Sequence, residues 1–178
     1  LAAIDIAKNE KKDIFLRFVN VSSLTSKGFG QGKYSLSNEE FFNFFTPDKP
    51  VICNFHGYPE TLKSILFNYP VESTRFDIRG YIECGSTTTP FDMHVRNQTS
   101  RYHIAMAIFE KLAQMDRISQ PEAKQIIEKF QNKIDENTAY IKENGIDLPE
   151  IDEWQWGRLS VDKQRDSLIA SAHDVSDC

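Results

Sequence analysis

Short apolar runs divide the chain into alternating segments. They occupy residues 14–21, 50–57 and 75–82, and the first is a nearly continuous series of β-branched and aromatic residues. Runs of this length and composition are typical of strands, and a continuous run predicts a strand that is covered on both faces. The third run alternates in part with charged residues, so we expect that strand to be less fully covered.

Apolar residues with helical spacing lie between and after these runs. They recur every three to four positions in residues 1–8, 99–115 and 119–145, which predicts an amphipathic helix for each range. Gly145 follows the longest of these ranges and is a typical helix stop. Because residue 1 already lies inside a helical pattern, we expect the chain to be a piece of a longer protein.

Helix starts are marked by capping residues. Ser37 is followed three positions later by Glu40, and Ser119 is followed by Glu122 in the same way. Each pair predicts a capping box, in which two side chains satisfy backbone N–H groups of the first turn. Pro59 in "YPETLKSILF" suits the first turn of another helix. Helices that alternate with strands predict an α/β fold, with a mostly parallel sheet and helices on both faces.

Composition and charge limit what the chain can form and which kinds of molecule it can bind. The chain has 178 residues, of which 40% are hydrophobic, enough for one domain over residues 1–156. We expect residues 157–178, which lack regular spacing, to form a peripheral or disordered tail. The formal charge of -5 provides no basic stripe for nucleic acid, and no run of about 18 apolar residues is present for a membrane. Three widely spaced cysteines favour reduced thiols and a cytoplasmic location.

Polar residues follow the second apolar run, in "NFHGYP". Ligands of open parallel sheets bind at the carboxyl ends of the strands, so His56, Gly57 and Tyr58 are candidates for contact with a ligand or another domain. His56 can be read as an acid, a base or a phosphate-binding group. The alternative, which we favour, is a histidine hydrogen-bonded at a turn or an interface.

A second candidate loop, "RGYIECGSTTTPFDM", follows the third run. Its candidate residues are Arg79, Ser86, Thr87, Thr88 and Thr89. The four hydroxyl groups can donate hydrogen bonds to an anion, but such runs more commonly cap turns, here the turn that Pro90 enforces. Asp92 and His94 are too few to form a metal site, so we expect no metal ligands.

The motifs taken together resemble one enzyme family. The stretches "LAAIDI", "DKPVICNFHGYP", "IRGYIECGSTTTPFDM", "NQTSRYHIAM" and "YIKENGIDLPEIDEWQW" occur in the order and spacing of the C-terminal region of phosphoketolases. These are thiamine diphosphate enzymes of the transketolase-like family. The resemblance covers residues 1–156, and the combination of HGYP with RGY and TTTPFDM is specific to the family. Departures from its pattern are Cys84, Ser86 and the residues before Arg101, where an aspartate is expected.

The resemblance implies a domain of the transketolase C-terminal type, which follows two cofactor-binding domains in a homodimer or higher oligomer. The parent reaction would convert xylulose 5-phosphate, and often fructose 6-phosphate, with phosphate into acetyl phosphate, an aldose phosphate and water. Thiamine diphosphate and magnesium would lie between the upstream domains. The resemblance therefore implies no catalytic, cofactor-binding or metal-binding residue in this chain, which we expect to be inactive alone.

These observations favour one interpretation of residues 79–93, with two rivals. We interpret them as a rigid joint that packs on an upstream domain or on the dimer partner. The first rival is a regulatory module, in which His56 and the Ser/Thr run bind a phosphorylated metabolite. The second is a cysteine hydrolase that uses Cys84, although no sequence pattern supplies its base.

Overall fold

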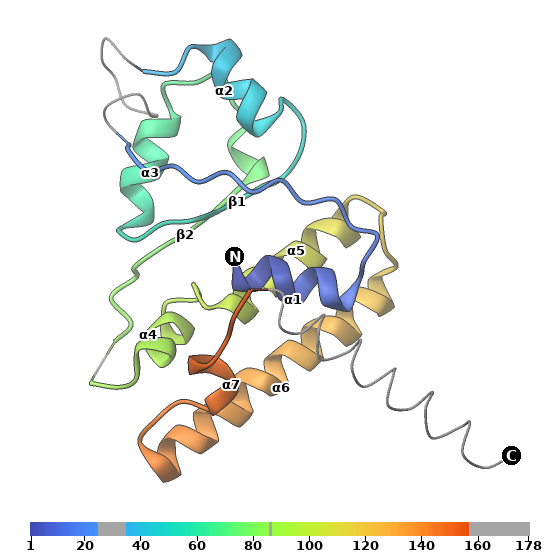
Figure 1. Ribbon diagram of the computed structural model, residues 1–178. Coiled ribbons are helices and arrows are strands. Elements are labelled where there is room, and N and C mark those ends of the chain that lie inside the picture. Colours follow the sequence, from blue (N-terminus) through green and yellow to red (C-terminus); the bar gives the residue numbers. More distant parts are fainter. Residues whose placement is uncertain (25–34, 86, 157–178) are drawn as a thin grey trace, which may run out of the picture. The chain divides into compact units, whose positions relative to one another are not determined.

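The computed structural model describes residues 1–24, 35–85 and 87–156 (Figure 1). They belong to two compact units. A terminal unit comprises Leu1–Phe15 and Arg101–Cys178, and a central unit comprises Leu16–Ser100. The expected tail over residues 157–178 lies outside the described residues.

The central unit contains a parallel sheet of two strands among its described residues. Strand β1 (Val51–Asn54) pairs with β2 (Phe76–Arg79), and Cys53 lies opposite Ile78. The helices of this unit are α2 (Asn38–Phe45), α3 (Pro59–Leu66), the single 3-10 turn η1 (Ser73–Arg75) and α4 (Pro90–Arg96). Figure 1 shows α3 beside the two arrows of the sheet. The α/β class with a parallel sheet is confirmed, and the sheet is small.

One face of this sheet packs on an aromatic core. Phe41 of α2 is completely buried and stacks on Tyr69 with ring centroids 4.2 Å apart. Leu62 and Leu66 of α3 complete the buried cluster, and three sheet residues pack against it: Cys53, Phe76 and Ile78. Because successive strand residues point to opposite faces, the charged residues between them lie on the other face. All four residues of β2 are half-buried, whereas Asn54 of β1 is exposed, so the expectation that the third run is less fully covered than the others is wrong.

The first apolar run does not form a strand. Residues 14–21 are extended, but they pair with no strand of the described residues, and Phe15 is 100% exposed. The prediction of a strand covered on both faces is therefore wrong. The physical reason is that a strand needs a neighbour for its N–H and C=O groups, whereas this run crosses from one unit to the other between Phe15 and Leu16.

The terminal unit is helical in its described residues. It contains α1 (Ala2–Glu10), α5 (Arg101–Gln114), α6 (Gln120–Asn144) and α7 (Pro149–Asp152). The rings of Phe109 and Phe130 lie 6.1 Å apart where α5 packs on α6. The three helices predicted for this unit are confirmed. Among the described residues, no helix has the length and apolar character needed to cross a bilayer.

The predicted caps hold the helix ends. The Ser37 hydroxyl accepts a hydrogen bond from Glu40 N at 3.2 Å, and the Glu40 carboxylate accepts one from Ser37 N at 2.8 Å, a complete capping box. Ser119 also accepts from Glu122 N, but the Glu122 carboxylate pairs with Lys11 at 2.9 Å and not with Ser119 N, so the second predicted capping box is wrong in its reciprocal bond. Gly145 ends α6 with a φ of 73°, a left-handed conformation that favours glycine.

Candidate functional site

The two predicted loops meet at the carboxyl ends of β1 and β2. Phe55 N donates a hydrogen bond to Arg79 O at 2.9 Å, and Tyr81 N donates one to Gly57 O at 2.8 Å. A Cβ atom added to Gly80 would lie 2.2 Å from Gly57 O, so this approach of two backbones requires glycine. The structure thus brings the HGYP and RGY motifs together, and it does so through backbone contacts.

Two tyrosines extend this contact to the surface. The rings of Tyr58 and Tyr81 meet edge to face with centroids 5.5 Å apart, and the Tyr58 hydroxyl donates to the Glu83 carboxylate at 3.0 Å. That hydrogen bond raises the pKa of Tyr58. His56 is exposed, and no hydrogen bond or ion pair joins it to another residue in the part of the chain that the structure describes. Within those residues, His56 therefore lacks the hydrogen-bonded neighbour that would orient a catalytic base. It also lacks the hydrogen bond at a turn that we favoured as the alternative.

Arg79 is already compensated by a neighbouring carboxylate. Its guanidinium lies 2.9 Å from the Asp77 carboxylate and donates to the backbone oxygen of Gln98 at 3.3 Å. Both charged side chains lie on the sheet face that points away from the aromatic core and are half-buried. An anionic ligand at Arg79 would have to compete with Asp77, so this arginine is poorly suited to capture phosphate.

The hydroxyl run caps a short helix. Thr89 is the N-cap of α4, and its hydroxyl accepts a hydrogen bond from Asp92 N at 3.2 Å. Thr88 Oγ1 donates to the buried Asp92 carboxylate at 2.8 Å, and Arg96 Nε donates to the same oxygen at 2.6 Å. Thr87 is exposed, and Ser86 lies outside the described residues. The capping alternative is thus confirmed for Thr89, whereas Thr88 bonds a side-chain carboxylate and caps no backbone group in these contacts.

Asn97 fixes the loop to the end of α4, a role that sequence reasoning missed. This buried side chain accepts from Ile82 N at 2.9 Å and donates to Cys84 O at 3.1 Å and to Met93 O at 2.8 Å. No local sequence signal marks such a residue, because its partners lie up to 15 positions away. Asn97 therefore joins Ile82 and Cys84 of the loop to the C-terminal end of α4.

A cap of this kind has a measurable effect on stability. We expect Thr89→Ala to lower the free energy of unfolding by about 1 kcal/mol, because the Asp92 N–H loses its acceptor. The matched control is Thr87→Ala, which changes an exposed threonine two positions away and should leave stability within about 0.5 kcal/mol of the parent value. Urea unfolding followed by circular dichroism measures both. Equal effects of the two substitutions would contradict the cap.

The cysteines differ in environment. Burial raises the pKa of Cys53 in β1 to about 11, whereas Cys84 is exposed in the loop after β2. Among the described residues, no group of three or more histidine, cysteine, aspartate or glutamate side chains lies close enough to hold a metal ion. Cys53 is thus a half-buried strand residue with a raised pKa, and of the two described cysteines a hydrolase would depend on Cys84.

Thiol labelling tests the difference between Cys53 and Cys84. In a Cys178→Ser background, we expect Cys84 to react with a disulfide reagent at the rate of a model thiol. Cys53 should react at least about a hundredfold more slowly, because a pKa of about 11 rather than 9.0 leaves that much less thiolate. Reaction of Cys84 faster than the model thiol would instead indicate an activated nucleophile.

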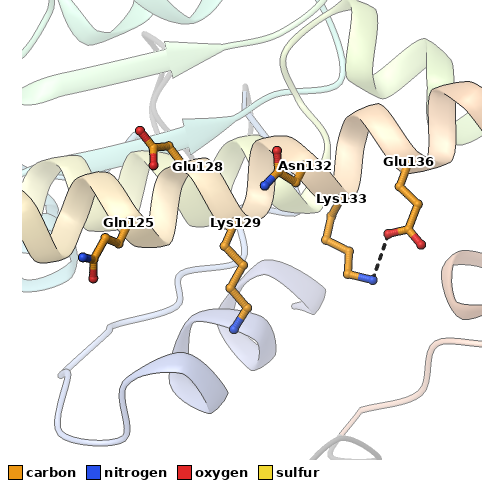
Figure 2. A pocket seen from close by; sticks show the side chains of 6 residues that line it. All are labelled: Gln125, Glu128, Lys129, Asn132, Lys133 and Glu136. Atoms are coloured by element: carbon orange, nitrogen blue, oxygen red, sulfur yellow. Dashed lines mark hydrogen bonds and ion pairs between the residues drawn. The ribbon is translucent and has the colours of Figure 1, made fainter.

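The terminal unit has a surface hollow of about 370 Å³ that runs along α6 and is open to solvent (Figure 2). Its lining residues are Gln125, Glu128, Lys129, Asn132, Lys133 and Glu136. Figure 2 shows Lys129 and Lys133 pointing to the same side of the helix, where Lys129 pairs with Glu10 at 2.5 Å and Lys133 with Glu136 at 3.2 Å. The cations of this hollow are thus already paired with carboxylates.

Residues 1–156 match the protein family described as the XFP C-terminal domain. A protein of Brucella abortus named "Probable phosphoketolase" is 38% identical over 157 residues, which are 88% of this chain and 19% of that protein. "Probable phosphoketolase 2" of Nostoc sp. is 36% identical over the same shares. "Probable phosphoketolase" of Pseudomonas putida is 34% identical over 161 residues, which are 90% of this chain and 20% of that protein. The chain therefore spans about a fifth of the length of these relatives.

Proposed function

Because this chain belongs to the XFP C-terminal domain family, we propose that it is the non-catalytic C-terminal domain of a phosphoketolase. The parent enzyme would cleave xylulose 5-phosphate, with fructose 6-phosphate as a second substrate, and use phosphate to release acetyl phosphate, an aldose phosphate and water. The observation that carries the proposal is the structure of the strand ends. There Arg79 pairs with Asp77, and in the loop that follows Thr88 and Thr89 bind Asp92, so these candidate ligand groups already have partners within the chain.

The described residues do not fit the cofactor of such an enzyme. Magnesium-bound thiamine diphosphate needs a cluster of oxygen ligands for the metal, and the described part of this chain offers no group of three metal-binding side chains. Its two strand-end candidates for an anion are an exposed histidine, His56, and an arginine, Arg79, that already pairs with Asp77. We therefore place the cofactor and the reacting sugar phosphate in the upstream domains of the parent and derive no catalytic step here.

The role of the domain would be to pack on other parts of the parent enzyme. In this proposal it binds the upstream domains of a cytoplasmic homodimer or higher oligomer, and the loop of residues 79–93 is a rigid joint at that contact. The hydrogen bonds of Asn97 support this role, because they tie Ile82 and Cys84 to α4 before any partner binds.

Activity measurements test the proposal. With xylulose 5-phosphate, phosphate, thiamine diphosphate and magnesium supplied, we expect the full-length parent to form acetyl phosphate and this chain alone to form none. Thr88→Ala with Thr89→Ala in the parent should lower its thermal unfolding temperature and leave the Michaelis constant for the sugar phosphate unchanged. Turnover by the isolated chain, or a selective rise of that Michaelis constant, would contradict a non-catalytic packing domain.

A further inference from the structure

Three neighbouring apolar side chains are exposed where the HGYP and RGY motifs meet. Tyr58 is 49% exposed, Tyr81 is 40% exposed and Ile82 is 46% exposed. The tyrosine rings touch edge to face, and Ile82 follows Tyr81 directly in the chain. We call these three residues the strand-end patch.

The strand-end patch is held in place by bonds on each of its members. Tyr58 donates its hydroxyl to Glu83, Tyr81 donates its N–H to Gly57, and Ile82 donates its N–H to Asn97. An apolar surface that is already ordered loses little conformational entropy when a partner covers it. Tyrosine is also enriched at the centres of protein interfaces, where its ring is buried and its hydroxyl keeps a hydrogen bond. Ordered and aromatic, this surface has the properties of a docking site.

We propose that the strand-end patch docks on the part of the parent enzyme that precedes this domain in the same chain. This inference rests on the proposed function. About four fifths of the length of the relatives lies outside the region that this chain matches, and the matching family is a C-terminal domain. The occupant is thus an upstream segment that presents apolar side chains to the tyrosines. A cation at its edge would complement the Glu83 carboxylate, which already accepts the Tyr58 hydroxyl.

A second exposed aromatic residue of the same unit provides a control. Phe67, which follows α3, is 91% exposed, and no aromatic pair involving it is found among the described residues. It matches the patch residues in being apolar and accessible, but its backbone N–H bonds only within its own helix end, to Lys63 O at 3.1 Å, and does not tie together two distant segments. Scattered single residues of this kind are normal on protein surfaces.

Site-specific photocrosslinking in the full-length parent tests the proposal. Benzoylphenylalanine replaces either Tyr81 or Phe67, and the products are separated by denaturing electrophoresis and mapped by mass spectrometry. We expect the probe at position 81 to form cross-links within one chain, at monomer mass, to peptides upstream of residue 1. The probe at position 67 should give several times less. Cross-links at position 81 that join two chains, or none, would overturn the proposal.

Stability measurements separate this inference from the proposed function. Ile82→Lys should lower the thermal unfolding temperature of the full-length parent but leave that of the isolated chain unchanged, because only the parent buries the patch. Phe67→Lys should change neither. An equal decrease in both proteins after Ile82→Lys would overturn the docking surface. The proposed function fails on a different readout, namely formation of acetyl phosphate by the isolated chain.

Discussion

Gly80→Ala is expected to lower the free energy of unfolding by about 3 kcal/mol, because the new methyl group has no space. Its carbon would lie 2.2 Å from Gly57 O and 3.1 Å from Pro59 Cδ. Gly57 lies in the turn between β1 and α3, and Pro59 is the first residue of α3. Gly57 O also accepts the Tyr81 N–H, so the backbone has to move and that bond is strained. Urea unfolding followed by circular dichroism should show a midpoint lower by about 1 M or more.

A second glycine of the same loop provides the matched control. A methyl group at Gly85 would meet the Met93 side chain, with its Cε atom at 2.6 Å and its sulfur atom at 3.2 Å. Methionine is unbranched and can rotate away, so we expect Gly85→Ala to shift the midpoint far less. A Gly80→Ala protein as stable as the Gly85→Ala protein would show that the two strand ends do not meet as described.

Arg75→Met is expected to lower the free energy of unfolding by more than about 3 kcal/mol. The buried guanidinium donates hydrogen bonds to three backbone oxygens at and beyond the end of α2, those of Phe45, Thr46 and Lys49. It also lies over the Phe76 ring, 4.6 Å from the centroid, and burial lowers the pKa of the guanidinium. Methionine fills much of the space but leaves the carbonyl groups without these donors.

Arg17 is the control for this substitution. It donates to two backbone oxygens of the same helix end, Asn43 O at 2.8 Å and Phe44 O at 3.1 Å, but from an exposed position. Because water can replace its bonds, Arg17→Met should cost less than about 1 kcal/mol in the same unfolding experiment. Similar losses for the two variants would contradict the view that burial makes Arg75 important.

Helices and their ends could be predicted because their signals are local. The Ser37 box, Pro59 at the start of α3 and Gly145 after α6 each act within one turn of the chain, and each is confirmed. The strand prediction for residues 14–21 relied on composition alone. Composition shows that a segment can be a strand, but pairing depends on residues far away in the sequence, and Phe15 and Phe18 remain exposed.

In the candidate site, too, local contacts could be predicted from the sequence and distant contacts could not. The cap at Thr89 follows from a threonine before Pro90 with an aspartate three positions on. The same pattern marks the start of α4, a helix that we did not predict from the sequence. The close approach of Gly80 to Gly57 and the three bonds of Asn97 depend on how distant segments pack, so the sequence does not predict them.

In our proposal the strand-end residues maintain structure and docking and do not bind a metabolite. Calorimetric titration of this chain with xylulose 5-phosphate, inorganic phosphate and ATP, one at a time, separates these two roles. No saturable heat is expected for any of the three. Saturable binding that is lost in His56→Ala or Arg79→Ala would contradict this proposal and would identify the strand ends as a regulatory site for phosphorylated metabolites.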